Sequence, residues 1–97
     1  MSEAVKLVSR QGSTSVHIDV RIEESGDLLF SGHDLGEAPE EFFGDFDYEY
    51  FLSIPATEKD RVLLALIEKL YRGNESVVSE FREFMQSKGI PCMFHSF

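Results

Sequence analysis

The chain has 97 residues, of which 42% are hydrophobic and nine are Phe. A chain of this length and composition can bury enough apolar surface to fold without disulfides or metals, which excludes a disordered chain. Eighteen acidic and nine basic side chains give a net charge of −9. This charge argues against binding to nucleic acid or to an anionic membrane, because both would repel the chain.

The chain has a single cysteine, Cys92, so the sequence predicts no intramolecular disulfide and a reducing compartment. The first residues do not combine a basic region with an apolar one, as a signal peptide would, and the longest apolar run is much shorter than a membrane span. We therefore expect a cytoplasmic protein whose residues 1–97 form one domain.

The first half of the sequence predicts an antiparallel meander. Residues 15–22 alternate between polar and β-branched apolar side chains, which is the pattern of a strand with one buried and one wet face. Residues 4–9 are expected to pair with this strand through a turn at residues 11–13. A second turn at residues 24–27 leads into a short third strand at residues 28–30.

Residues 31–44 interrupt this alternation with four residues that break regular elements, Gly32, Gly36, Pro39 and Gly44. We expect a structured loop here, held to the core by its apolar side chains. Alternation returns at residues 45–54, which predicts a fourth strand. Its inner face would carry Phe46, Tyr48, Tyr50, Leu52 and Ile54, and its outer face Asp45, Asp47, Glu49, Phe51 and Ser53.

The second half of the sequence predicts two helices. Thr57 is expected to cap a helix that ends before Gly73, and Asn74 a second helix that runs to about Lys88. The apolar tail 90–97 would return as an edge strand. The predicted fold is α+β with the order β-β-β-β-α-α-β: an antiparallel sheet of four to five strands with the C-terminal helical hairpin packed on one face. The other face would stay open to solvent.

An acidic tract is the most distinctive feature of the sequence. No Lys or Arg lies between Arg21 and Lys59, whereas this interval holds eleven acidic residues. The tract predicts a docking surface for a basic protein, because complementary charge speeds association. The alternative is a solvated face that serves solubility. The residues expected to bind the partner are Asp34, Glu37, Glu40, Glu41, Asp45, Asp47, Glu49 and Phe51.

A second hypothesis places a small-molecule pocket or a small active site under loop 31–44, lined by His33, Asp34 and Tyr48. An imidazole beside a carboxylate is suited to general-base chemistry near neutral pH. However, adjacent residues rarely orient each other as a dyad, and the sequence identifies no nucleophile. A local turn is the alternative interpretation, and we assign no catalytic residue.

The sequence predicts neither a metal site nor a cofactor. The three His residues and Cys92 are dispersed along the chain. Asp45, Asp47 and Glu49 have the spacing with which a calcium-binding loop begins, but the sixth position is Tyr50 where the loop needs Gly. These acids are interpreted as exposed carboxylates of a strand.

The segments 31–36, 43–50 and 63–66 together resemble a family of small bacterial proteins of unassigned function. This resemblance covers most of the chain after Asp27 and implies no activity, cofactor or catalytic residue. In size and charge alone, the chain is also similar to nuclease-immunity proteins. We therefore expect a non-enzymatic protein-binding module, with an inhibitor or immunity role as its most specific form. Homodimerisation through the open sheet face or the tail is a further possibility.

Overall fold

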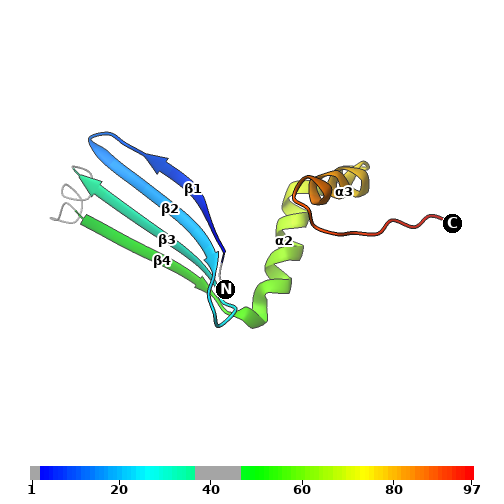
Figure 1. Ribbon diagram of the computed structural model, residues 1–97, viewed down its shortest axis with the longest axis horizontal. Helices are drawn as coiled ribbons and strands as arrows, with labels where there is room; N and C mark the ends of the chain where they lie inside the picture. Colours follow the sequence, from blue (N-terminus) through cyan, green and yellow to red (C-terminus); the bar gives the residue numbers. More distant parts are fainter. Residues whose placement is uncertain (1–2, 37–46) are drawn as a thin grey trace. The chain divides into compact units, whose positions relative to one another are not determined.

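The structure is a computed structural model that describes residues 3–36 and 47–97. Four antiparallel strands precede two α-helices (Figure 1), which confirms the predicted α+β class and the order of these elements. The elements are β1 (Ala4–Arg10), β2 (Thr14–Ile22), β3 (Leu28–Gly36), β4 (Asp47–Ile54), the 3₁₀ turn η1 (Ala56–Glu58), α2 (Lys59–Tyr71) and α3 (Val77–Ser87).

Contacts along the chain divide it into two compact units, residues 1–62 and residues 63–97. The first unit holds the sheet, η1 and the first residues of α2. The second holds the rest of α2, α3 and the tail. A single domain over residues 1–97 and the packing of the helical hairpin on one face of the sheet both stay predictions.

The sheet is a meander in which each strand pairs with its neighbour in the chain, in the order β1-β2-β3-β4 (Figure 1). Its register separates two faces. One face is mainly apolar, with Val20 opposite Phe30 and Phe30 opposite Leu52. The other face is polar, with His17 opposite His33 and His33 opposite Glu49. The alternation predicted for residues 15–22 and for the described part of residues 45–54 is thus confirmed.

Strand β3 is much longer than the sequence predicts. Residues 31–36 pair with β2 on one side, and residues 31–35 pair with β4 on the other, so the loop interpretation is wrong for this stretch. The pairing overrides the low strand propensity of Gly and Asp. The remainder of the expected loop lies outside the described residues, as do Glu37, Glu40, Glu41 and Asp45 of the expected docking surface.

The ring of Tyr50 explains why a glycine, Gly32, lies in the middle of this strand. A Cβ atom at Gly32 would lie only 2.1 Å from the ring of Tyr50, its partner on β4. Gly32 is buried, whereas Tyr50 is half-buried. The missing side chain therefore lets an aromatic ring lie directly on the strand backbone.

The pairing of β1 with β2 is irregular. Lys6 is opposite Asp19 and Val8 is opposite Ile18, so the register shifts at Leu7. One extra residue in β1 forms a bulge, which twists this edge strand locally.

The β2–β3 turn is tied to the chain after β4. The Ala56 amide donates a hydrogen bond of 2.8 Å to Asp27 Oδ1, and the Glu23 amide donates one of 2.8 Å to the Asp27 carbonyl. The expected Thr57 cap is wrong. Thr57 lies inside η1, and Pro55 occupies the N-cap position without a side-chain hydrogen bond.

Glycines mark the ends of the two helices, as predicted: Gly73 follows α2 with φ +84° and Gly89 follows α3 with φ +69°. The expected Asn74 cap is wrong, because α3 starts at Val77 and Ser76 occupies its N-cap position. The Asn74 side chain instead accepts a hydrogen bond of 2.8 Å from the Ser76 amide, which forms the turn before the helix.

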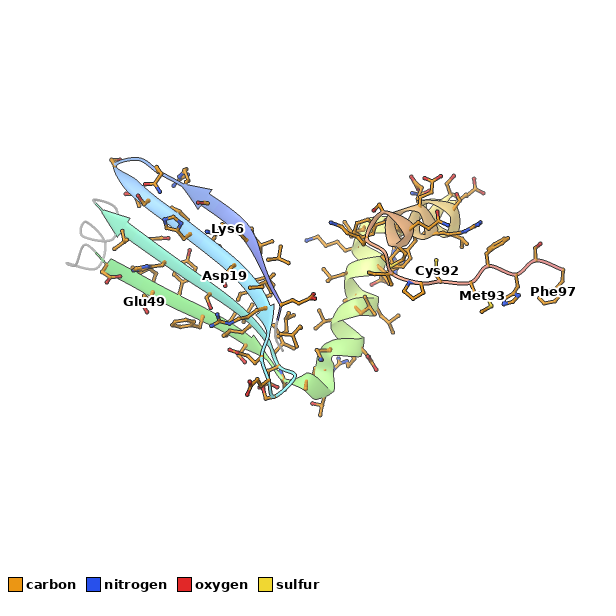
Figure 2. All side chains as sticks on the ribbon, in the orientation of Figure 1. Lys6, Asp19, Glu49, Cys92, Met93 and Phe97 are labelled. Atoms are coloured by element: carbon orange, nitrogen blue, oxygen red, sulfur yellow. The ribbon has the colours of Figure 1, made fainter. Side chains whose placement is uncertain are left out.

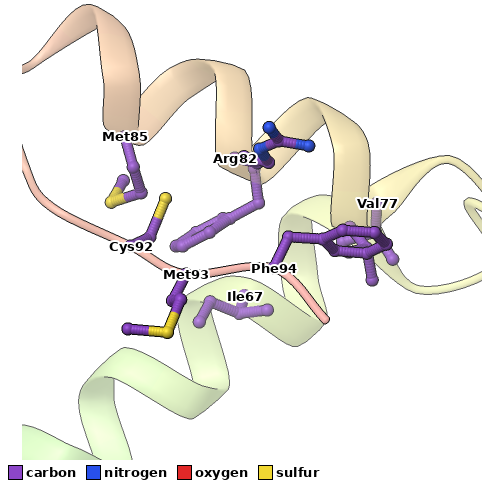
Figure 3. Close-up of a pocket in the computed structure, with 9 residues that line it drawn as sticks. Ile67, Val77, Arg82, Met85, Cys92, Met93 and Phe94 are labelled. Carbon is purple, nitrogen blue, oxygen red and sulfur yellow. The ribbon is translucent and has the colours of Figure 1, made fainter. Parts of the chain in front are cut away.

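The predicted tail strand is wrong, because residues 90–97 form no strand. The Ile90 amide donates to the Met85 carbonyl at 2.9 Å, which turns the chain back after α3. Cys92, Met93 and Phe94 then line an apolar groove together with side chains of α2 and α3 (Figure 3). The tail side chains thus find apolar neighbours on helices within their own unit. In the described part of the chain, no helix combines the length and the apolar character needed to cross a bilayer.

Candidate functional site

The polar face of the sheet carries four of the predicted site residues: His33, Asp47, Glu49 and Phe51. We define the polar face by its charged, imidazole and aromatic members: Lys6, His17, Asp19, Arg21, His33, Asp47, Glu49 and Phe51. Figure 2 shows Lys6, Asp19 and Glu49 on β1, β2 and β4. Asp47, Glu49 and Phe51 thus share one side, as predicted for the outer face of the fourth strand.

A shallow hollow of about 270 Å³ lies on the polar face, between residues of β2, β3 and β4. His17, Asp19, Arg21, Ser31, Gly32, His33, Glu49 and Phe51 line it. This volume is at the lower limit of pockets that enclose small organic ligands, which are about 300–1,000 Å³. The hollow is therefore suited to a single side chain or an ion rather than to an enclosed cofactor.

Three polar atoms at this hollow are shielded from solvent and have no hydrogen-bond partner among the described residues: Asp19 Oδ1, Arg21 Nε and Ser31 Oγ. Arg21 Nε is 3.7 Å from Glu23 Oε1, which is an ion-pair distance but too long for a hydrogen bond. Such unpaired groups cost about 1–3 kcal/mol each. The hollow thus has unused capacity for polar contacts.

His33 lies between two carboxylates of β4. Its Nε2 atom forms a hydrogen bond with Asp47 Oδ1 and lies 3.8 Å from Glu49 Oε1. The imidazole is 36% exposed, and the two carboxylates are 52% and 58% exposed. Because β3 and β4 are paired across this point, the sheet holds all three side chains together.

The His33–Asp34 pair considered under the second hypothesis is not formed, because neighbouring residues of a strand point to opposite faces. Asp34 is on the face of Tyr48 and Tyr50, and it accepts a hydrogen bond of 3.2 Å from the Tyr50 hydroxyl. His33 therefore lies on the opposite face of the sheet from Asp34 and Tyr48, the other two residues of the second hypothesis. Sequence reasoning missed Asp47 and Glu49 as the neighbours of His33, since the register that joins them depends on the unpredicted extension of β3.

The environment of the Tyr50 hydroxyl opposes its ionisation. Burial, followed by the negative charge of Asp34 and the hydrogen bond to it, raises the pKa of Tyr50 above its ordinary value of 10.0. The neutral form is favoured in the folded state, so this contribution to stability is present below pH 10.0 and is lost as the pH rises through the folded pKa.

An absorbance titration of the phenolates measures this shift. Tyr50→Phe should remove the transition that lies above pH 10.0, and Asp34→Asn should move that transition toward 10.0 without reaching it, because the effect of burial remains. Asp27→Asn is the control, since its carboxylate binds the Ala56 amide and no tyrosine. A titration that is the same in Asp34→Asn and in the unmodified protein would contradict the assignment.

The second unit carries an apolar groove of about 300 Å³ along α2, α3 and the tail (Figure 3). Ile67, Val77, Val78, Phe81, Arg82, Met85, Cys92, Met93 and Phe94 line it. The Arg82 guanidinium lies 5.5 Å from the centre of the Phe94 ring, a cation–π contact that helps to hold the tail. Such a lining can bind apolar groups but offers little for acid–base or metal chemistry.

Comparisons of the chain with models of protein families, with curated proteins and with solved structures find no match in any of the three.

Proposed function

We propose that the protein is a non-enzymatic binding module whose polar face contacts a basic protein partner. One observation carries this proposal: Phe51 is 63% exposed on β4, on the same face as two carboxylates of that strand. An aromatic ring placed among carboxylates combines the two features that protein interfaces use, an apolar anchor and complementary charge.

The distribution of charge on the polar face supports a contact centred on β3 and β4. Lys6 and Arg21 are on β1 and β2, whereas β3 and β4 carry no Lys or Arg. A Lys or Arg side chain of the partner would meet Asp47 and Glu49 next to the Phe51 ring. A cationic group in the adjoining hollow would also offset the cost of the unpaired Asp19 oxygen.

An inhibitor or immunity role is the most specific form of this proposal. The partner would then be a basic enzyme, and occupation of its positive surface by the carboxylates of β4 would compete with an acidic substrate. Electrostatic attraction of this kind acts mainly on the association rate, so binding should weaken as ionic strength rises.

Site-specific photocrosslinking tests the proposal. Phe51 is replaced by benzoylphenylalanine in the full-length chain, which is then illuminated in an extract of its native cells at low and at moderate salt. We expect a crosslinked protein of basic isoelectric point whose yield falls with salt. A crosslinker at Phe97, an exposed ring of the tail, is the matched control and should give no such product.

Two further variants locate the contact. Phe51→Ala should abolish co-purification of the same partner, because loss of a central aromatic anchor costs about 2 kcal/mol or more, which is at least about 30-fold in affinity. Phe97→Ala should leave co-purification intact. Equal recovery of the partner by Phe51→Ala and by the unmodified protein would rule out the polar face as its binding site.

A further inference from the structure

We propose that His33, Asp47 and Glu49 form a binding site for a divalent transition-metal ion, with Zn²⁺ as the best-fitting ion. One ligand atom from each of the three side chains lies within 4.8 Å of the other two. The site shares Asp47 and Glu49 with the proposed protein contact, but the argument for it does not depend on that proposal.

The ligand chemistry favours Zn²⁺ over Mg²⁺ or Ca²⁺. Mg²⁺ and Ca²⁺ are bound by oxygen atoms, whereas an imidazole nitrogen together with carboxylate oxygens suits Zn²⁺ and its neighbours in the first transition row. Zinc sites that keep a bound water have three protein ligands and an open fourth position, and this group supplies three ligands. The imidazole also separates this group from an ordinary cluster of acidic side chains.

The geometry of the sheet already brings these ligands together. His33 and Glu49 are directly opposite each other in the β3–β4 register, and Asp47 is two residues away on the same face of β4. Ligands of a tetrahedral zinc ion with bonds of about 2.1 Å lie about 3.4 Å apart. Glu49 Oε1 is 3.8 Å from His33 Nε2, which is close to this separation, and the ion would replace the present hydrogen bond between Nε2 and Asp47 Oδ1.

The surroundings favour a cation at this point. Both strands that carry the ligands lack Lys and Arg, and Arg21, which lines the same hollow from β2, lies at ion-pair distance from Glu23, with 3.7 Å between Nε and Oε1. The adjoining hollow contains the imidazole of His17 and the unpaired carboxylate oxygen of Asp19. These groups can accept hydrogen bonds from a metal-bound water, as the outer partners of metal sites do.

Calorimetric titration of the tag-free, full-length protein with Zn²⁺ tests the proposal. We expect one saturable site, and we expect His33→Gln to weaken binding by at least about tenfold, since even residues behind the ligands of a metal site change affinity by about 10–100-fold. Glu49→Gln should weaken it in the same direction. Mg²⁺ should not compete at equal concentration.

The tail supplies the control. Cys92 and His95 are the other exposed soft ligands in the described part of the chain, so Cys92→Ser combined with His95→Gln should leave the site intact. Loss of Zn²⁺ binding in this double variant, or unchanged binding in His33→Gln, would overturn the proposal.

Nuclear magnetic resonance of the three imidazoles in the unmodified protein gives a test that needs no variant. One equivalent of Zn²⁺ should shift the ring signals of His33 and leave those of His95 in place. The reverse pattern, or no shift of any imidazole, would show that the ion binds elsewhere or not at all. This measurement decides the question even where a substitution prevents folding.

Discussion

Gly36→Ala should lower the free energy of unfolding by about 3 kcal/mol or more, the largest effect we expect from a single methyl group in this protein. Gly36 has φ +127°, a backbone conformation that costs a residue with a Cβ about 1–3 kcal/mol. The added Cβ would also lie 2.1 Å from the Ser13 carbonyl oxygen and 3.0 Å from the Thr14 Cα. These are backbone atoms that cannot rotate away, so β2 and β3 must separate at this end.

Urea denaturation followed by far-ultraviolet circular dichroism measures this loss. Gly12→Ala is a closely matched control, because Gly12 precedes the same Ser13, and the nearest atom to its added Cβ is the Thr14 carbonyl oxygen at an ordinary 3.7 Å. The control should change stability by less than about 1 kcal/mol. Similar midpoints for the two variants would show that the close approach of Gly36 to the β1–β2 turn is not formed in solution.

Gly32→Ala should destabilise the protein by about 2 kcal/mol for a different reason. The added Cβ overlaps the Tyr50 ring, with contacts of 2.1, 2.2 and 2.7 Å. A ring can swing away, unlike a backbone, but it then loses its packing on β3 and its hydrogen bond to Asp34.

A double-mutant cycle isolates this contact. In a Tyr50→Ala background the added methyl group meets no ring, so Gly32→Ala should become neutral or stabilising by about 0.5–1 kcal/mol, because alanine loses less backbone freedom than glycine. The coupling between the two positions should therefore reach about 2–3 kcal/mol. An equal cost for Gly32→Ala in both backgrounds would contradict the arrangement of the Tyr50 ring over Gly32.

The strands with regular alternation were predictable because a single sequence signal, the alternation of polar and apolar side chains, indicates both the extended conformation and the face on which each side chain lies. Residues 15–22 alternate polar and apolar side chains without interruption, and residues 47–54 do so with Phe51 as the one exception. Residues 31–36 do not. Gly32 and Gly36 indicate a turn when they are considered locally, but in the structure the first makes room for the Tyr50 ring and the second makes room for the Ser13 carbonyl. Neither Tyr50 nor Ser13 is close in sequence to the glycine that it contacts.

The candidate metal site was unpredictable for the same reason. His33 has an acidic neighbour in the sequence, Asp34, and this proximity suggested the wrong pair. In a strand the adjacent residue is on the opposite face, whereas residues across the pairing are in reach. Only the register places Glu49 opposite His33, and that register requires β3 to continue beyond Phe30. Asp47, Glu49 and Phe51 were predictable as one face, since they lie on a single alternating strand.

The bulge at Leu7 makes the two outer strands of the sheet unequal. An edge strand exposes main-chain groups that can pair with another chain, and a bulge disturbs the spacing that such pairing requires. β1 has this irregularity and carries Lys6 beside it, whereas β4 pairs in unbroken register from Asp47 to Ile54. The spacing of main-chain groups is therefore less suited to pairing with a further strand along the outer edge of β1 than along that of β4.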